Sequence, residues 1–375
     1  MRNKLLQTFA LGTWSFLCVL PVLLKTGPNV VTLTYFAGSK NLWEGVSPYG
    51  WLEPGADLFF YPPFFAAAWK IFGLLGPMAG VLFWVFVNAL VFWWGISQWF
   101  LIKNEINKWL WFFWIATAIE LDISLRYQQA NALLAGLILW SLSALKDRRM
   151  GLSGFLMALA THLKVFPLLI ALAIALPLDI AFFASYVASC FILLGLPALA
   201  VGFPEVLWLH WEQFQSTTAD FSQRQLLDLR ACLSRLGMES LGALAQKGAG
   251  LLGGLTLLLY RLRVPNPEFS WGLWYTSFVT LLLAITPKAE SPTFVWAAPG
   301  YLFLAKALNS KAKLLLGFIA FSMTIVYSSI LPKAWVLSFT ENYLSKTFAN
   351  FAFWGLSSFL LLREIVFKKQ KGPLN

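Results

Sequence analysis

The sequence predicts an all-α protein, a polytopic bundle of about 12 membrane-spanning segments. Hydrophobic residues make up 59% of the 375-residue chain and charged residues only 12%, about half the charged share of soluble domains. The mean hydropathy is +0.68. Apolar runs of roughly 17 to 25 residues recur along the chain, the length that a helix needs to cross a bilayer. We therefore expect residues 1–375 to form a single integral membrane domain.

Ten apolar runs with polar flanks are the first predicted spans. They are 5–25, 77–101, 109–125, 129–145, 180–202, 248–262, 270–286, 292–307, 312–331 and 347–364. The first run is of span length and lacks a small-residue cleavage site, so we expect an uncleaved span rather than a signal peptide. A further apolar block, 151–176, is interrupted by His162, Lys164 and Pro167. Because this block is too long for one straight span and too short for two full ones, it is predicted to be a broken pair with Lys164 at its vertex.

Basic residues predict the orientation of the bundle. When both termini are cytoplasmic, the whole formal net charge of +11 falls on the inner loops. This is the positive-inside pattern. It predicts a multi-pass protein of the plasma (inner) membrane, and a high pI that reflects topology and anionic lipid rather than nucleic acid.

Three regions on the predicted outer side are long enough to build a site: 26–76, 203–247 and 331–346. Within the first, residues 62–75 are mostly apolar, begin with Pro62-Pro63 and end before Gly76-Pro77. This length and punctuation favour a short interfacial helix over a span.

The first outer region also holds three carboxylates beside the membrane, Glu44, Glu53 and Asp57. Ionisable groups are costly at that position and therefore indicate function. Asp57, in DLFFYPPF, is the predicted general base, placed to take a proton from a hydroxyl. Glu44 and Glu53 are its rivals. The alternative is an ordinary loop whose aromatic residues lie at headgroup level.

A second constellation is RYQQANALL, at the turn between two spans. Gln129 and Asn131 lie where a helix begins, where their amides either bind sugar hydroxyls or cap the helix. Glu120 and Asp122, about one turn before Arg126, favour a pair with that arginine over any role in binding.

Cations in three later segments are candidates for binding a phosphate. Lys164, in HLKVFP, either snorkels to the interface or faces a cavity. Arginine suits bidentate phosphate contact, and we expect one of the three arginines in 221–237 to make it while another is solvated or paired with Asp228. The short turn TPKAESPTF carries a Lys and a Glu that either line the site or pair with each other. These candidates are Lys164, Arg224, Arg230, Arg235, Lys288 and Glu290.

Several kinds of chemistry have no motif in this chain. There is no phosphate-binding GxxxxGK[ST] loop, no GxGxxG after a strand, no HExxH and no nucleophile elbow. The three cysteines lack metal-ligand spacing. We therefore expect no cofactor and no metal. A reaction on the outer side, where nucleotides are absent, requires a donor that the membrane itself carries.

The order of YFAGSKNLWEGVSPY, FFYPPF, YQQANALL, HLKVFP, a polar loop with arginines and TPKAESPTF resembles the polytopic glycosyltransferases of family 87. This family lies within the GT-C superfamily and includes polyprenol-phosphate-mannose-dependent mannosyltransferases. The resemblance covers roughly Tyr35 to Phe303. It implies short helices lying on the membrane in the first outer loop, a carboxylate base, a lipid-phosphate sugar donor and inversion at the anomeric carbon.

The family's patterns can be placed on this chain residue by residue. Its tyrosine-proline pair falls on Tyr61 and Pro62, its GQxN on Gln128, Gln129 and Asn131 with the Gly replaced, and its KxxP on Lys164 and Pro167. Two features depart from the pattern. Many members carry Asp where this chain has Val31 and Thr32, and the usual His-rich outer turn is replaced by 288–291. The resemblance then implies a base from elsewhere in the loop, or an altered or lost activity.

The sequence thus predicts an inverting glycosyltransferase that moves a mannose-like sugar from a polyprenyl phosphate to a lipid or glycan acceptor on the outer face. Asp57 would deprotonate the acceptor, Lys164 and arginine would hold the phosphate, and Tyr61 would orient hydroxyls together with Gln129 and Asn131. A secondary transporter or lipid flippase is the alternative. It is disfavoured because transporters pair broken helices between two halves. A non-catalytic scaffold is the third reading.

Overall fold

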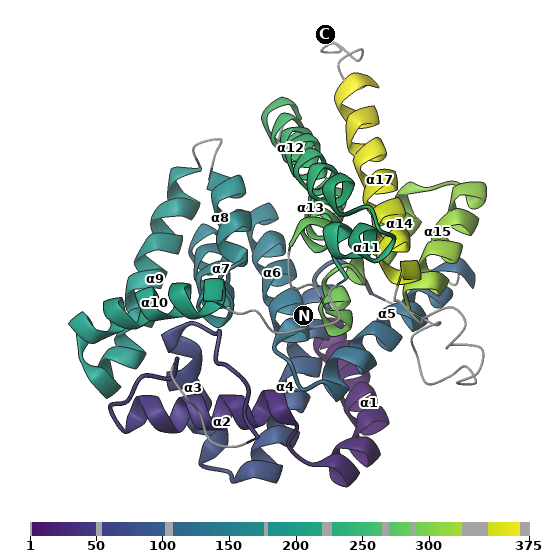
Figure 1. Cartoon of the computed structure of the whole chain (residues 1–375). Helices are drawn as coiled ribbons and strands as arrows, with labels where there is room; N and C mark the ends of the chain where they lie inside the picture. The colour runs from purple at the N-terminus through teal and green to yellow at the C-terminus, as the bar shows by residue number, and fades with distance from the viewer. Residues whose placement is uncertain are drawn as a thin grey trace. The chain divides into compact units, whose positions relative to one another are not determined.

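The computed structural model describes residues 2–49, 55–101, 108–175, 179–219, 227–264, 270–286, 290–324 and 344–367. Within these ranges the regular structure consists of 16 α-helices and one 3-10 helix, with no strand (Figure 1). The prediction of an all-α protein is confirmed. The contacts between residues divide the chain into two compact units, each described here by itself: Met1–Ile102 with Ser124–Gln223, and Lys103–Ile123 with Arg224–Asn375.

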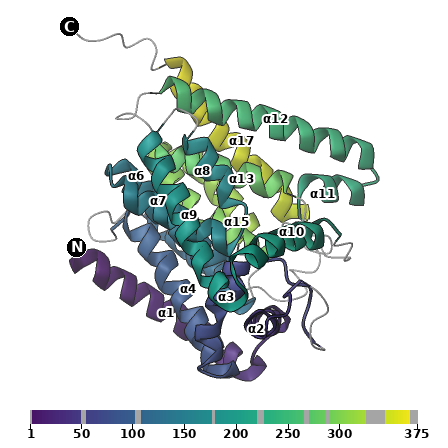
Figure 2. The same ribbon diagram turned by 90° about the vertical axis from the view of Figure 1, so that its left-hand side faces the viewer.

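The first unit is a row of packed helices with shorter helices at one end. Helix α1 packs on α4, α4 on α6, α6 on α7 and α7 on α9 (Figure 2). The short helices α2 and α3 pack on each other and on α9. The helices of this unit are α1 (Arg2–Thr26), α2 (Val30–Trp43), α3 (Pro63–Gly73), α4 (Pro77–Ser97), α6 (Asn131–Lys146), α7 (Met150–Leu163), α8 (Pro167–Ala175), α9 (Ile180–Val201) and α10 (Phe203–Ala219).

Proline and glycine set the boundaries of several of these helices. Pro63 occupies the first turn of α3, and Gly76, with φ of +80°, precedes Pro77 at the start of α4. The short helix predicted over 62–75 is therefore confirmed. Between α7 and α8 the chain is extended at Lys164, with φ −159° and ψ 137°, so the broken pair with Lys164 at its vertex is confirmed as well.

The second unit packs α13 against both α12 and α17. Its buried aromatic rings include Tyr301, which stacks on Phe353 at a centroid distance of 5.0 Å. Its elements are α11 (Leu229–Arg235), α12 (Glu239–Arg263), α13 (Trp271–Ile285), the 3-10 helix η3 (Ser291–Trp296), α14 (Pro299–Ala307), α15 (Ser310–Met323) and α17 (Leu344–Phe367). Helix α5 (Lys108–Arg126) contributes residues to both units.

Two predicted elements differ from the structure. The span expected over 292–307 is instead η3 followed by α14, because Pro299 has no backbone N–H with which to continue a helix. Helix α12 starts at Glu239, nine residues before the span expected at 248. In addition, α2 was not foreseen as a helix in its own right.

Four of the described helices, α1, α4, α9 and α12, are long and apolar enough to cross a membrane. Helices α6, α7 and α13 are shorter but also apolar. The protein is therefore a membrane protein. The total of twelve spans and the single membrane domain stay predictions.

Candidate functional site

An aromatic cluster joins α2, the loop that follows it and α3. Tyr35 of α2 is fully buried, and its ring contacts those of Tyr61 and Phe65 at centroid distances of 4.9 and 4.7 Å. The hydroxyl groups of Tyr35 and Tyr61 are 2.8 Å apart. The loop lies so close to α2 that a Cβ on Gly38 would come within 2.6 Å of the Phe59 ring. This packing fixes the position of Tyr61.

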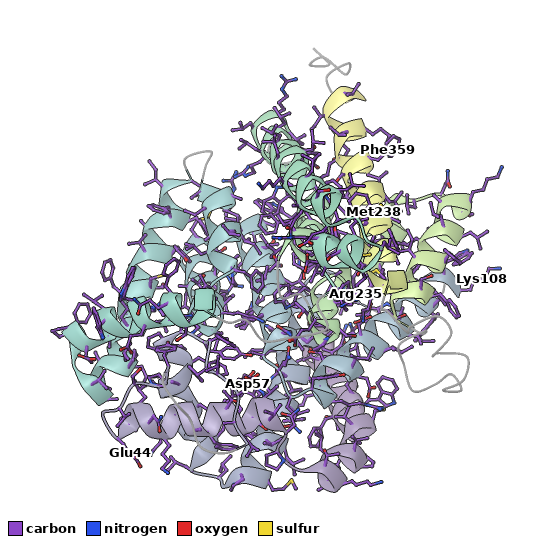
Figure 3. All side chains as sticks on the ribbon, in the orientation of Figure 1. Glu44, Asp57, Lys108, Arg235, Met238 and Phe359 are labelled. Carbon is purple, nitrogen blue, oxygen red and sulfur yellow. The ribbon has the colours of Figure 1, made fainter. Side chains whose placement is uncertain are left out.

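A hydrogen bond to α2 fixes the backbone of Asp57, whereas its side chain is exposed. Its N–H donates to Thr34 Oγ1 on α2 at 2.7 Å, and its Oδ1 accepts from the Leu58 N–H at 2.8 Å. Figure 3 shows Asp57 beside α2 and Glu44 at the end of that helix, away from Asp57. Glu44 is the exposed C-cap residue of α2. Glu53 lies outside the described residues.

Gln128 joins the start of α2 to the turn that precedes α6. Its Oε1 accepts from the Thr32 hydroxyl at 2.6 Å and from the Asn29 N–H at 3.0 Å, while its Nε2 donates to the Gly27 carbonyl at 2.9 Å. Its backbone carbonyl accepts from the Trp84 indole at 2.9 Å. The φ of Gln128 is +57°, the left-handed conformation that favours glycine.

Three polar residues from the segments YQQANALL and HLKVFP are connected by hydrogen bonds: Gln129, Asn131 and Lys164. Asn131 Nδ2 donates to Gln129 Oε1, and Lys164 Nζ donates to Asn131 Oδ1 at 3.1 Å. Neither Gln129 nor Asn131 is the N-cap residue of α6, which is Ala130. Asn88 of α4 accepts instead from the Leu133 N–H at 3.1 Å.

These contacts connect four motifs of the sequence in series, two of them directly at the beginning of α2. Thr34 holds Asp57 and Thr32 holds Gln128, and both threonines lie in the first two turns of the helix. Gln128 is followed directly by the polar chain that ends at Lys164. A carboxylate, three amides and an ammonium group of the first unit are thus linked through these contacts. They are groups that can take a proton from a hydroxyl and hold an anion.

Helix α10 supplies contacts that sequence reasoning missed. Glu212 accepts from the Ser47 hydroxyl, and Gln213 Nε2 donates to the Phe60 carbonyl at 3.1 Å. Ser216 donates to the Tyr49 carbonyl at 3.4 Å. Burial, with a smaller effect of Glu212, raises the pKa of the Tyr49 phenol, which therefore stays a donor to the Tyr61 carbonyl at 2.7 Å. No short-range pattern links these residues.

The remaining predicted site residues belong to the second unit or are not described. Arg230 and Arg235 lie on α11 and are exposed, and Arg230 is 3.9 Å from Glu239. Asp228 caps α11 by accepting from the backbone N–H groups of Arg230 and Ala231, and burial raises the pKa of its carboxyl. Glu290 is the N-cap residue of η3. Arg224 and Lys288 lie outside the described residues.

A buried ion pair that the sequence did not indicate lies in the second unit. Glu120 of α5 pairs with Lys346 of α17 at 2.9 Å, and both side chains are fully buried. Lys346 also donates to the Ser291 hydroxyl at 3.1 Å. Within the described residues, no group of three His, Cys, Asp or Glu side chains is arranged to hold a metal ion.

Comparison with known proteins identifies the family of this chain. The sequence pattern of glycosyltransferase family 87 matches residues 59–287, which is more than half of the chain and includes Tyr61, Gln129, Asn131 and Lys164. A comparison with curated proteins finds no match. The chain belongs to glycosyltransferase family 87 and is a membrane enzyme that transfers a sugar from a donor to an acceptor.

Proposed function

We propose that this protein is an inverting glycosyltransferase of GT-C type that moves a mannose-like sugar from a polyprenyl-phosphate donor to an acceptor hydroxyl. The observation that carries the proposal is the series of hydrogen bonds that connects four motifs in a member of family 87. The donor class follows from the resemblance and from the lack of a nucleotide-binding motif in the sequence.

In this proposal Asp57 is the general base. The acceptor hydroxyl transfers its proton to the Asp57 carboxylate while its oxygen forms a bond to the anomeric carbon. The bond between that carbon and the phosphate oxygen breaks, and both electrons leave with the lipid phosphate. Attack from the face opposite the phosphate inverts the anomeric centre. The exposed Asp57 side chain and its anchored backbone support this role.

The leaving phosphate needs a fixed positive charge, and Lys164 is the proposed source. Asn131 accepts from its ammonium group and so restrains it. A positioned cation stabilises developing negative charge more strongly in a partly dry site than in water. We propose that Gln129, Asn131 and Tyr61 orient hydroxyls of the sugar. Arg224, Arg230, Arg235, Lys288 and Glu290 stay candidates for binding the donor on the basis of the sequence alone.

The reaction is proposed to take place on the outer face of the plasma membrane, with both termini in the cytoplasm and about 12 membrane segments. The concentration of positive charge in the predicted inner loops supports this orientation. The donor then reaches the site as a membrane lipid, and its acceptor is another lipid or a glycan.

The decisive experiment replaces Asp57 by Asn, with Glu44→Gln as the matched control. Loss of a general base lowers the rate about 10²- to 10⁴-fold, so Asp57→Asn should abolish transfer from a radiolabelled polyprenyl-phosphate sugar in nanodiscs. Its thermal unfolding should match that of the unchanged protein. Full activity in Asp57→Asn and loss in Glu44→Gln would move the base to Glu44. Absence of any glycosylated product in the unchanged protein would favour the transporter or the scaffold.

A further inference from the structure

Helix α10 has two opposite faces of different character. Val206, Leu209 and Gln213 face the interior and are buried. The opposite face carries large apolar side chains that are about half exposed: Leu207 55%, Trp208 54%, Trp211 50% and Phe214 59%. Side chains three and four positions apart lie on the same side of a helix, so these four residues form a continuous surface, here called the aromatic face.

The position of α10 in the chain indicates what covers the aromatic face. Helix α9 is a candidate membrane span whose apolar side chains point outward, as with Ile192 and Leu199, exposed by 72% and 77%. It ends at Val201, Gly202 turns the chain with a φ of +85°, and α10 starts at the next residue. Figures 1 and 2 both show α10 leaving α9 at a steep angle. A helix that turns away where a span ends lies at the level of the lipid headgroups.

The composition of α10 is typical of a helix at the level of the lipid headgroups. Tryptophan is enriched at membrane–water interfaces because its ring is apolar and its N–H is polar. The charged residues of α10 are two glutamates and it has no Lys or Arg, so the attraction to lipid would be apolar and aromatic rather than electrostatic. An interfacial helix of this kind does not require anionic lipid.

The other side of α10 holds the loop that carries Asp57. Glu212 accepts from Ser47, Gln213 donates to the Phe60 carbonyl and Ser216 donates to the Tyr49 carbonyl. Residues before and after Asp57 are thus attached to one helix. Glu212 also accepts from the Trp208 indole at 3.0 Å, which links the loop contact to the aromatic face.

We propose that α10 lies in the bilayer interface with its aromatic face among the lipid headgroups, and that it holds the described parts of the loop between α2 and α3, residues 44–49 and 55–62, at that depth through Glu212. Glu212 is then a positioning residue for the transfer reaction. The position of α10 in the interface does not depend on the proposed function. The effect of Glu212 on sugar transfer rests on that function. The partner is the headgroup region of the membrane that α9 crosses.

The first experiment measures the depth of α10 directly. Single cysteines replace Trp211, Phe214 and, as a control on the exposed polar edge, Glu205, in a background where the three native cysteines are alanine. Each is spin-labelled in nanodiscs of either zwitterionic or mixed anionic phospholipid. Labels at 211 and 214 should collide with oxygen more than with a water-soluble nickel chelate, in both lipids, and the label at 205 should show the reverse. Equal access of the chelate to all three sites would overturn the seating.

The second experiment tests the connection to the loop. Glu212→Gln should speed amide hydrogen exchange in 44–49 and 55–62 about tenfold, because a neutral amide oxygen accepts from the Ser47 hydroxyl more weakly than a carboxylate does. It should lower kcat about tenfold and leave the KM for the donor within about twofold, because the base moves while the phosphate site does not. Glu205→Gln on the same helix should change neither quantity.

Unchanged exchange in Glu212→Gln would overturn the role of Glu212, even if the aromatic face proves to be embedded. Where Glu212→Gln fails to fold, Ser47→Ala removes the same hydrogen bond from the loop side and takes its place. A failure of the proposed function can be told apart from a failure of this inference, because the depth and exchange measurements do not depend on turnover.

Discussion

Gln128 is the residue at which two departures from the family pattern meet. The family places a Gly at this position, and many members carry an Asp where this chain has Val31 and Thr32. Gln128 has a left-handed backbone, with φ of +57°, and its amide binds the Thr32 hydroxyl and the start of α2. The two changes are therefore in physical contact. Because 96 residues separate them along the chain, no local pattern in the sequence reveals this.

Replacing Gln128 distinguishes the free-energy cost of its left-handed backbone from the stabilisation that its side-chain hydrogen bonds provide. The left-handed conformation costs a side-chain-bearing residue roughly 1–2 kcal/mol relative to Gly, so Gln128→Ala should be less stable than Gln128→Gly by about that amount. Both variants should be less stable than the unchanged protein, because the Gln128 side chain no longer accepts from the Thr32 hydroxyl and the Asn29 N–H or donates to the Gly27 carbonyl. Unfolding by denaturant in detergent micelles measures these differences. A Gly variant more stable than the unchanged chain would show that the side-chain bonds contribute little.

The buried pair of Glu120 and Lys346 allows a second test at this scale. Removing one partner of a buried ion pair costs about 3–5 kcal/mol, whereas replacing both with apolar residues can be nearly neutral. We expect Glu120→Leu and Lys346→Met each to lower the unfolding temperature strongly, and the double variant to recover most of the loss. The pair lies 2.9 Å apart, so its coupling energy should be large. Additive losses in the double variant would contradict this.

At the scale of the element, the sequence predicts helices best where proline and glycine mark their ends. The pairs Pro62-Pro63 and Gly76-Pro77 bound α3 correctly, and Pro167 ends the break after α7. The prediction misses α2, whose N-cap Asn29 is a local signal but whose outer-loop position suggested no helix. It also misses the break inside 292–307. An apolar run gives the same hydropathy whether it forms one span or a 3-10 turn followed by a short helix.

The crossing of α4 and α6 depends on glycine. A Cβ on Gly136 would lie 2.3 Å from the Val91 carbonyl oxygen, so α4 would have to move away. Overpacking of this kind costs about 1–3 kcal/mol, and Gly136→Ala should lower the unfolding temperature. Gly195 on α9 is the matched control, since nothing lies within 4 Å of its added Cβ. Gly195→Ala should be neutral or should stabilise the helix by up to about 1 kcal/mol. Equal effects at both sites would exclude close packing as the cause.

At the scale of the whole molecule, the sequence gives the membrane class and the site motifs but not the way in which the site residues are grouped. Tyr61, Gln129, Asn131 and Lys164 share the first unit with Asp57, whereas the arginines of α11 and Glu290 belong to the second unit. The motifs lie far apart along the chain, and their contacts depend on helix packing rather than on spacing. The contribution of α10 to the loop between α2 and α3 was unpredictable for the same reason.

The orientation of the chain in the membrane is the prediction on which the choice of a lipid-carried donor depends. The basic residues gather in the loops predicted to be inside, such as the one with Lys306, Lys311 and Lys313, and such loops stay in the cytoplasm. Val46 and Ser310 are both exposed. Val46 lies in a region predicted to be outside, and Ser310 lies in a loop predicted to be inside. In a background without the native cysteines, a membrane-impermeant maleimide should label Val46→Cys in intact cells and Ser310→Cys only after permeabilisation. The reverse pattern would place the loop between α2 and α3 in the cytoplasm. Nucleotide sugars are available there, so a lipid-phosphate donor would lose its physical justification.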